Sequence, residues 1–149
     1  MRWRWNLAHA HSLIVLGKIY TGRAEETEAH VVEALRLSPR DTHAYLWLHH
    51  AGLAKSVLGL HDEAAAWRRR SIEANRNFAQ AHFSLAYSLA QLGRLDEAHS
   101  AVKAGLALNP SFNISRAHAG WTALSDDPTI LAQTERWYEG LRNAGLPKE

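Results

Sequence analysis

An interval of 34 residues separates two similar segments, and this repetition limits the folds open to the chain. Gly93 follows Gly59 at that interval, and Asp96–Ala98 follows Asp62–Ala64 at the same interval. Repeats a few tens of residues long are typical of domains that stack one supersecondary unit many times. The sequence therefore predicts a stack of similar units.

The clearest copy of the repeat runs from Ala79 to Pro110 and contains two helical patterns. Apolar or small residues recur in its first half three or four positions apart, as one face of a helix requires. Gly93 interrupts this pattern, and Pro110 prevents the second helix from continuing. Small residues on both helices would let them approach closely, and these are Ala86, Ala98 and Gly105. Each copy is therefore expected to form two antiparallel helices joined by a glycine turn.

A third and weaker copy comes first in the chain. Gly22 precedes Gly59 by 37 residues, and Pro39 follows the second helical pattern of this copy. The three additional residues fall near Pro39–Asp41, in a loop between repeats. Because a longer loop costs little free energy, the insertion is compatible with the repeat.

The clearest copy resembles the tetratricopeptide repeat, whose pattern runs W-x2-L-G-x2-Y, then A-x3-F, then P. His82 stands in place of the opening tryptophan and Leu89 in place of tyrosine. The remaining matches are Leu85, Ala86, Ala98, Val102 and Pro110. The resemblance implies an all-α fold, an α-solenoid of about three helix-turn-helix repeats plus C-terminal capping helices. We expect a single domain over residues 1–149, with repeats at about 8–41, 45–78 and 79–112 and a cap at 113–149.

Three further segments resemble the C-terminal repeat region of a bacterial family. They are residues 35–41, 109–115 and 139–147. Members of that family carry such repeats behind a class III nucleotide cyclase (adenylate cyclase-type) domain or a winged-helix DNA-binding domain. The resemblance implies a regulatory segment of a larger signalling protein. We also expect Trp3 and Trp5, at the start of the sequence, to pack on an upstream neighbour or on a partner.

Composition excludes several classes of protein. The chain has no cysteine, so disulfides, thiol nucleophiles and cysteine zinc sites are absent. No run of 18 apolar residues exists, so we expect no membrane insertion and a cytoplasmic location. The net charge of +2 is too small to imply nucleic-acid binding. The basic run Arg68–Arg70 lies near Glu63 and Glu73, which is typical of a solvated helix face.

Catalytic and metal-binding motifs are also missing from the sequence. No G-x-S-x-G elbow and no glycine-rich phosphate loop occurs, so we expect no enzymatic activity. His9 and His11, like His49 and His50, are spaced so that a helix points them in different directions. We therefore expect no cofactor and no metal, although a site built between helices stays open.

The first helices of stacked repeats line a concave surface, which is the best candidate for binding. The predicted groove residues are Ser12, Leu16, Ile19, Tyr20, Leu46, His49, Leu53, Val57, Gln80, Phe83, Tyr87 and Gln91. Because these positions carry no cation, we expect an apolar or amphipathic protein segment rather than a terminal carboxylate. One alternative is that the last helix, with Trp137 and Tyr138, covers this surface internally. Others are a homo-oligomerisation domain, with the chain forming a homodimer, and a small-molecule sensor.

Overall fold

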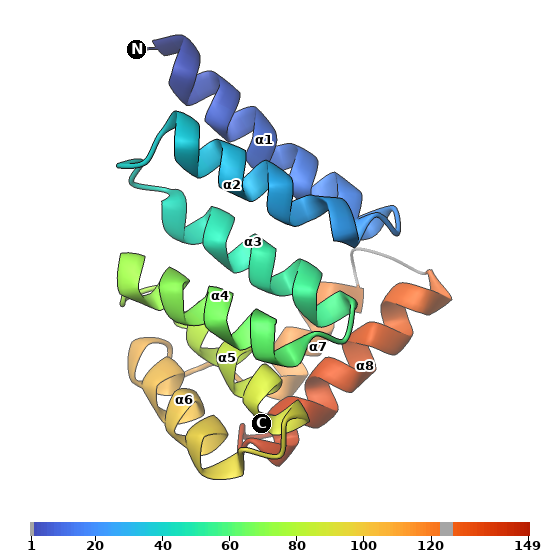
Figure 1. Cartoon of the computed structure of the whole chain (residues 1–149). Helices are drawn as coiled ribbons and strands as arrows, with labels where there is room; N and C mark the ends of the chain where they lie inside the picture. Colours follow the sequence, from blue (N-terminus) through green and yellow to red (C-terminus); the bar gives the residue numbers. More distant parts are fainter. Residues whose placement is uncertain (1, 123–126) are drawn as a thin grey trace. The chain divides into compact units, whose positions relative to one another are not determined.

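The computed structural model describes residues 2–122 and 127–149, and every regular element within them is a helix. The expected all-α fold of adjacent helix pairs is therefore confirmed (Figure 1). In chain order the elements are α1 (Arg2–Tyr20), the 3-10 turn η1 (Ala24–Glu26), α2 (Thr27–Leu37), α3 (Ala44–Val57), α4 (His61–Ala74), α5 (Ala79–Gln91), α6 (Leu95–Leu108), α7 (Ile114–Thr122) and α8 (Pro128–Asn143).

The chain divides into two compact units, Met1–Arg76 (unit 1) and Asn77–Glu149 (unit 2). In unit 1, α1 pairs with α2 and α3 pairs with α4, and α3 also lies against both helices of the first pair. In unit 2, α5 pairs with α6, while α8 lies against α5 and α7. The expectation of one domain over the whole chain stays a prediction.

The three predicted glycine turns share one geometry. Gly22, Gly59 and Gly93 have φ angles of 76°, 76° and 73°, a left-handed conformation that favours glycine. In each turn, the amide after the glycine donates a hydrogen bond to the carbonyl five residues earlier, as in the Schellman motif. These bonds are Arg23 to Lys18 at 2.8 Å, Leu60 to Lys55 at 2.9 Å and Arg94 to Leu89 at 2.9 Å. The repeat seen in the sequence is therefore also a repeat of backbone structure.

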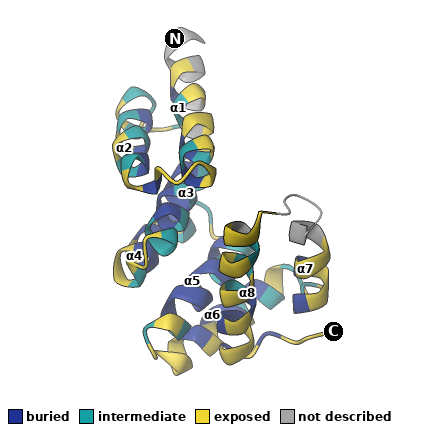
Figure 2. Ribbon diagram, turned by 90° about the vertical axis from the view of Figure 1, so that its right-hand side faces the viewer, coloured by how far each residue is buried: buried dark blue, intermediate teal, exposed yellow. Residues whose placement is uncertain are grey.

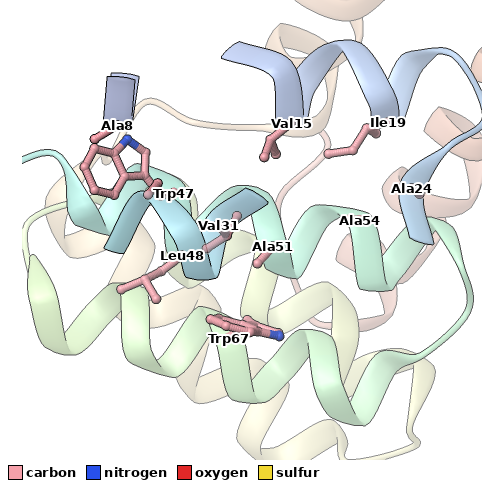
Figure 3. Close-up of a cluster of buried hydrophobic side chains, with 11 residues drawn as sticks. Ala8, Val15, Ile19, Ala24, Val31, Trp47, Leu48, Ala51, Ala54 and Trp67 are labelled. Atoms are coloured by element: carbon pink, nitrogen blue, oxygen red, sulfur yellow. The ribbon is translucent and has the colours of Figure 1, made fainter. Parts of the chain in front are cut away.

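The core of unit 1 is built from the facing sides of its four helices (Figure 3). Trp47 of α3 and Trp67 of α4 are the largest side chains in it, and both are buried. Val15 of α1 and Val31 of α2 are fully buried in the same cluster. Because burial of such side chains supplies much of the stabilising free energy, the two helix pairs form one packed unit.

Close contact between helices depends on glycine. A Cβ atom added to Gly105 of α6 would lie 2.6 Å from Cε1 of Phe83 in α5. A Cβ atom added to Gly52 of α3 would lie 2.9 Å from Cγ of Arg68 in α4. Ala86 and Ala98 are fully buried in unit 2. The small residues expected to permit close packing of α5 and α6 are thus in the interior.

Two neighbouring histidines of α3 are held neutral by their surroundings. Burial lowers the pKa of His50 from 6.5 to about 4. Burial, and then the positive charge of Arg68, lower the pKa of His49 well below its usual value. At neutral pH both imidazoles are therefore uncharged, and protonating either of them opposes folding of unit 1.

We predict that Gly105→Ala destabilises unit 2. The added methyl group overlaps the Phe83 ring, and such overpacking costs about 1–3 kcal/mol, more than the ~1 kcal/mol that alanine gains over glycine in a helix. Gly17→Ala in α1 is the matched control, because nothing lies within 4 Å of a Cβ atom placed there. Thermal unfolding should show a lower Tm for the first variant and an unchanged or higher Tm for the second. A rise in both would contradict the packing described above.

We predict that acid destabilises unit 1. Below pH 6.5 an unfolded chain takes up protons that folded His49 and His50 do not, so the free energy of unfolding falls between pH 6.5 and about 4. For His50 alone the loss is at most about 3 kcal/mol. Hydrogen exchange of the α3 amides at several pH values measures this loss for unit 1 itself. His50→Gln, which cannot be protonated in this range, should show a shallower pH dependence; an unchanged slope would argue against the role of His50.

Candidate protein-interaction surface

A row of half-buried side chains runs along the outer side of α3. We call this row the α3 stripe, and it consists of Leu46, His50, Leu53 and Val57. The spacing of four, three and four residues places them on one helix face. Leu46, Leu53 and Val57 pack with part of their surface against the core cluster and leave the rest accessible. The stripe is therefore fixed in place by the core and still open to a partner.

The first helix of the preceding pair extends this surface. Leu16 of α1 is half-buried and Tyr20 is exposed, and α1 lies against α3. At the 37-residue interval of these two copies, Leu16 corresponds to Leu53 and Tyr20 to Val57. We call the α3 stripe together with Leu16 and Tyr20 the unit 1 face. The histidine of this face carries no charge at neutral pH, so the face is apolar apart from the Tyr20 hydroxyl and the neutral imidazole.

The other groove residues expected in unit 1 are placed differently. Ile19 and His49 are buried, so they contribute to the interior and present little surface to a partner. The side chain of Ser12 lies outside the described part of the structure. His49 was the predicted groove residue, but the neighbouring His50 lies on the stripe instead. Both histidines are three or four residues from Leu46 and from Leu53, so spacing alone does not distinguish them.

The groove residues expected in unit 2 fall into two groups. Gln80 is half-buried and Gln91 is exposed, whereas Phe83 and Tyr87 are buried. The ring of Phe83 stacks on Phe112 with centroids 4.2 Å apart. Phe83 is therefore part of the packing between α5 and α6, and it offers little area to a partner.

The chain's own last helix covers Tyr87. A Cβ atom added to Gly140 of α8 would lie 2.6 Å from Cδ2 of Tyr87, so the two helices meet here at close range. Tyr138 and Leu141 of α8 are buried as well. At the 34-residue interval Tyr87 corresponds to Leu53. Helix α8 therefore occupies on α5 the face that corresponds to the α3 stripe.

A cleft of about 320 Å³ lies in unit 2 between α7, α8 and the C-terminal residues. His118 Nε2 is 3.2 Å from the carboxylate of Glu135 at its rim. The Ser115 hydroxyl donates a hydrogen bond to the carbonyl of Lys148 at 2.8 Å. Burial raises the pKa of Tyr138, which also lines the cleft, to about 12. The phenol therefore stays protonated at neutral pH.

The histidines and acidic residues that the structure describes are dispersed. Among them, no group of three or more His, Cys, Asp or Glu side chains could hold a metal ion. His11 of α1 and His30 of α2 do form a pair between helices, with their Nδ1 atoms 3.0 Å apart. The two residues are 19 positions apart in the sequence, so helical spacing does not indicate this pair. None of the described helices is both long and apolar enough to span a membrane.

One part of the chain matches a known protein family. Residues 79–112, which include α5 and α6, match the family model described as Tetratricopeptide repeat. No curated protein matches the sequence. Repeats of this family generally mediate protein–protein interaction or scaffolding and are not catalytic. The helix pair with the Schellman turn at Gly93 and the Gly105–Phe83 contact is thus a repeat of the tetratricopeptide type.

Proposed function

We propose that this chain is a non-catalytic protein-interaction module whose unit 1 face binds an amphipathic helix of a partner protein. The observation that carries the proposal is the position of α8. In unit 2 this helix covers Tyr87 on α5, and the corresponding Leu53 on α3 keeps part of its surface accessible. A face that accepts a helix in one repeat is suited to accept a helix in the next.

The chemistry of the unit 1 face defines the kind of helix. An apolar face is matched by apolar side chains spaced three or four residues apart on the partner, which is the usual mode of helix recognition in a groove. Gly140 lets α8 approach Tyr87 closely, so we expect a small residue of the partner opposite Leu53.

The wider role follows from the resemblance of residues 35–41, 109–115 and 139–147 to the repeat region of the bacterial family named above. We propose that the module is the regulatory segment of a bacterial cytoplasmic signalling protein, of the cyclase-linked or winged-helix-linked kind. Binding of a partner helix would then be the signal that this segment passes to the rest of the signalling protein. This role requires no cofactor and no nucleic-acid contact by these residues.

The test is a binding selection with a defined probe. The probe is a display library of 16-residue helices based on the α8 sequence Pro128–Asn143, in which the apolar positions are varied. We expect binders whose affinity falls at least about tenfold, or about 1.4 kcal/mol, when Leu53→Asp places a charge in the stripe. Leu60→Asp is the control, because Leu60 is an exposed leucine of the same unit in the turn before α4.

Circular dichroism should show that both variants keep their helix content. The proposal fails if no helix binds the chain. It also fails if Leu53→Asp binds the selected helices as tightly as the unmodified chain, or if Leu60→Asp weakens binding equally.

A further inference from the structure

Helix α1 has an apolar face that no described part of unit 1 covers. Its inner face carries Ala8 and Val15, both fully buried. On the opposite side, Leu7, Leu13 and Ile14 are 52%, 59% and 43% exposed, and Ala10 and Gly17 are also exposed. Figure 2 shows exposed stretches of ribbon along α1. We call these five outer residues the α1 seam. Charged or polar side chains would be expected on a solvated helix face, so this composition indicates a contact surface.

The seam has the spacing of a helix-packing surface. Leu7 and Ile14 are seven residues apart, and so are Ala10 and Gly17, which is the heptad interval of coiled coils. The repeat itself gives a second argument. At the 37-residue interval, Ala10, Ile14 and Gly17 correspond to positions of α3 that are all buried by helix packing; these are Trp47, Ala51 and Ala54. Three of the five seam residues therefore lie at repeat positions that a helix uses to pack against another helix, while Leu7 and Leu13 correspond to the half-buried Ala44 and His50.

We propose that the α1 seam packs against the α1 seam of a second copy of this chain, with the two helices antiparallel about a two-fold axis. In an antiparallel pair the large residues of one helix face the small residues of the other. Leu7 lies opposite the partner's Gly17, and Ile14 lies opposite the partner's Ala10. A parallel pair would place small residues opposite small residues and leave unfilled space at each. The seam thus complements itself in one orientation, as a two-fold interface requires.

Charges near the seam do not oppose this pairing. The five seam residues are uncharged. Lys18, the nearest described cation along the helix, is already bound to Glu26 of its own chain. His11, on the same side of α1, is hydrogen-bonded to His30. As far as the described side chains go, two copies can therefore meet without bringing unpaired like charges together at the seam.

The proposed dimer leaves most of the unit 1 face free. Leu13 lies beside Leu16 and Tyr20 at one edge of the seam, whereas Leu7 and Ile14 lie on another side of α1. The α3 stripe is not part of the seam. The two surfaces therefore adjoin at Leu13 and differ in their other residues, and this inference goes beyond the proposed function. Leu7 to Gly17 spans only about 15 Å of helix. We expect the interface to be smaller than the ~800 Å² per partner of a standard interface, and dissociation to occur in the micromolar range or above.

The first test is the mass in solution across protein concentrations from about 1 µM to about 1 mM, a range that brackets such an affinity. The mass should rise from that of a 16.7 kDa monomer toward twice that value. Ile14→Arg should remain monomeric throughout. Leu95→Arg, at an equally exposed leucine of unit 2, should dimerise like the unmodified chain. A monomeric unmodified chain, or dimers of Ile14→Arg, would overturn the proposal.

The second test determines the orientation by disulfide trapping. The natural chain has no cysteine, and a side chain at Gly17 meets nothing within 4 Å. In the double variant Leu7→Cys/Gly17→Cys the two thiols of one chain are about 15 Å apart, too far to pair within it. Oxidation should therefore give covalent dimers of the double variant and none of Gly17→Cys alone. Equal trapping of Gly17→Cys alone would indicate a parallel or nonspecific pair and would refute the antiparallel register.

Binding of the library helices separates this proposal from the proposed function. Ile14→Arg should bind them as the unmodified chain does, because the substitution lies outside the unit 1 face. Loss of both dimer and helix binding in this variant would show that the seam and the unit 1 face are one surface, contrary to the inference.

Discussion

The packing of this chain depends on large side chains that sit directly against glycines of neighbouring helices. Phe83 lies on Gly105, Arg68 lies on Gly52, and Tyr87 lies on Gly140. At each contact the absence of a Cβ atom sets how closely two helices approach. The approach in turn decides which side of each helix is buried and which side remains for a partner. Since packed interiors leave few voids, a methyl group at such a contact changes the whole pair of helices.

One repeat position consequently has two different environments in the same chain. Leu16, Leu53 and Tyr87 correspond to one another in the three helix pairs, at the intervals of 37 and 34 residues. Tyr87 is covered by α8, whereas Leu16 and Leu53 are half-buried. Helix α8 therefore shows, within unit 2, how an amphipathic helix fits this kind of face. The proposed binding of a partner helix applies the same packing to the pairs in unit 1.

Local features of the fold were predictable from sequence, and distant contacts were not. The glycine turns and helix pairs follow from a short pattern and its repetition, and Ala86, Ala98 and Gly105 were recognisable as sites of close approach. The contact of Tyr87 with Gly140 joins residues 53 positions apart, outside any repeat, so periodicity could not reveal it. Phe83 was expected in the groove from its place in the repeat, yet it is buried with its ring against Gly105. His49 and His50 differ by about 100° around one helix, and only the packing of α3 shows which of them is buried.

The two surfaces proposed for unit 1 would act together in a dimer. Each copy contributes one unit 1 face, and the two-fold axis through the α1 seam would relate these faces by symmetry. A partner that presents two amphipathic helices could then occupy both faces at once. Its second helix would bind at an effective concentration set by the linker between the helices, so modest contacts at each face would combine into tighter binding. Such a dimer would bind a partner with two helices more tightly than a single helix. Each face alone offers only a short apolar row along α1 and α3.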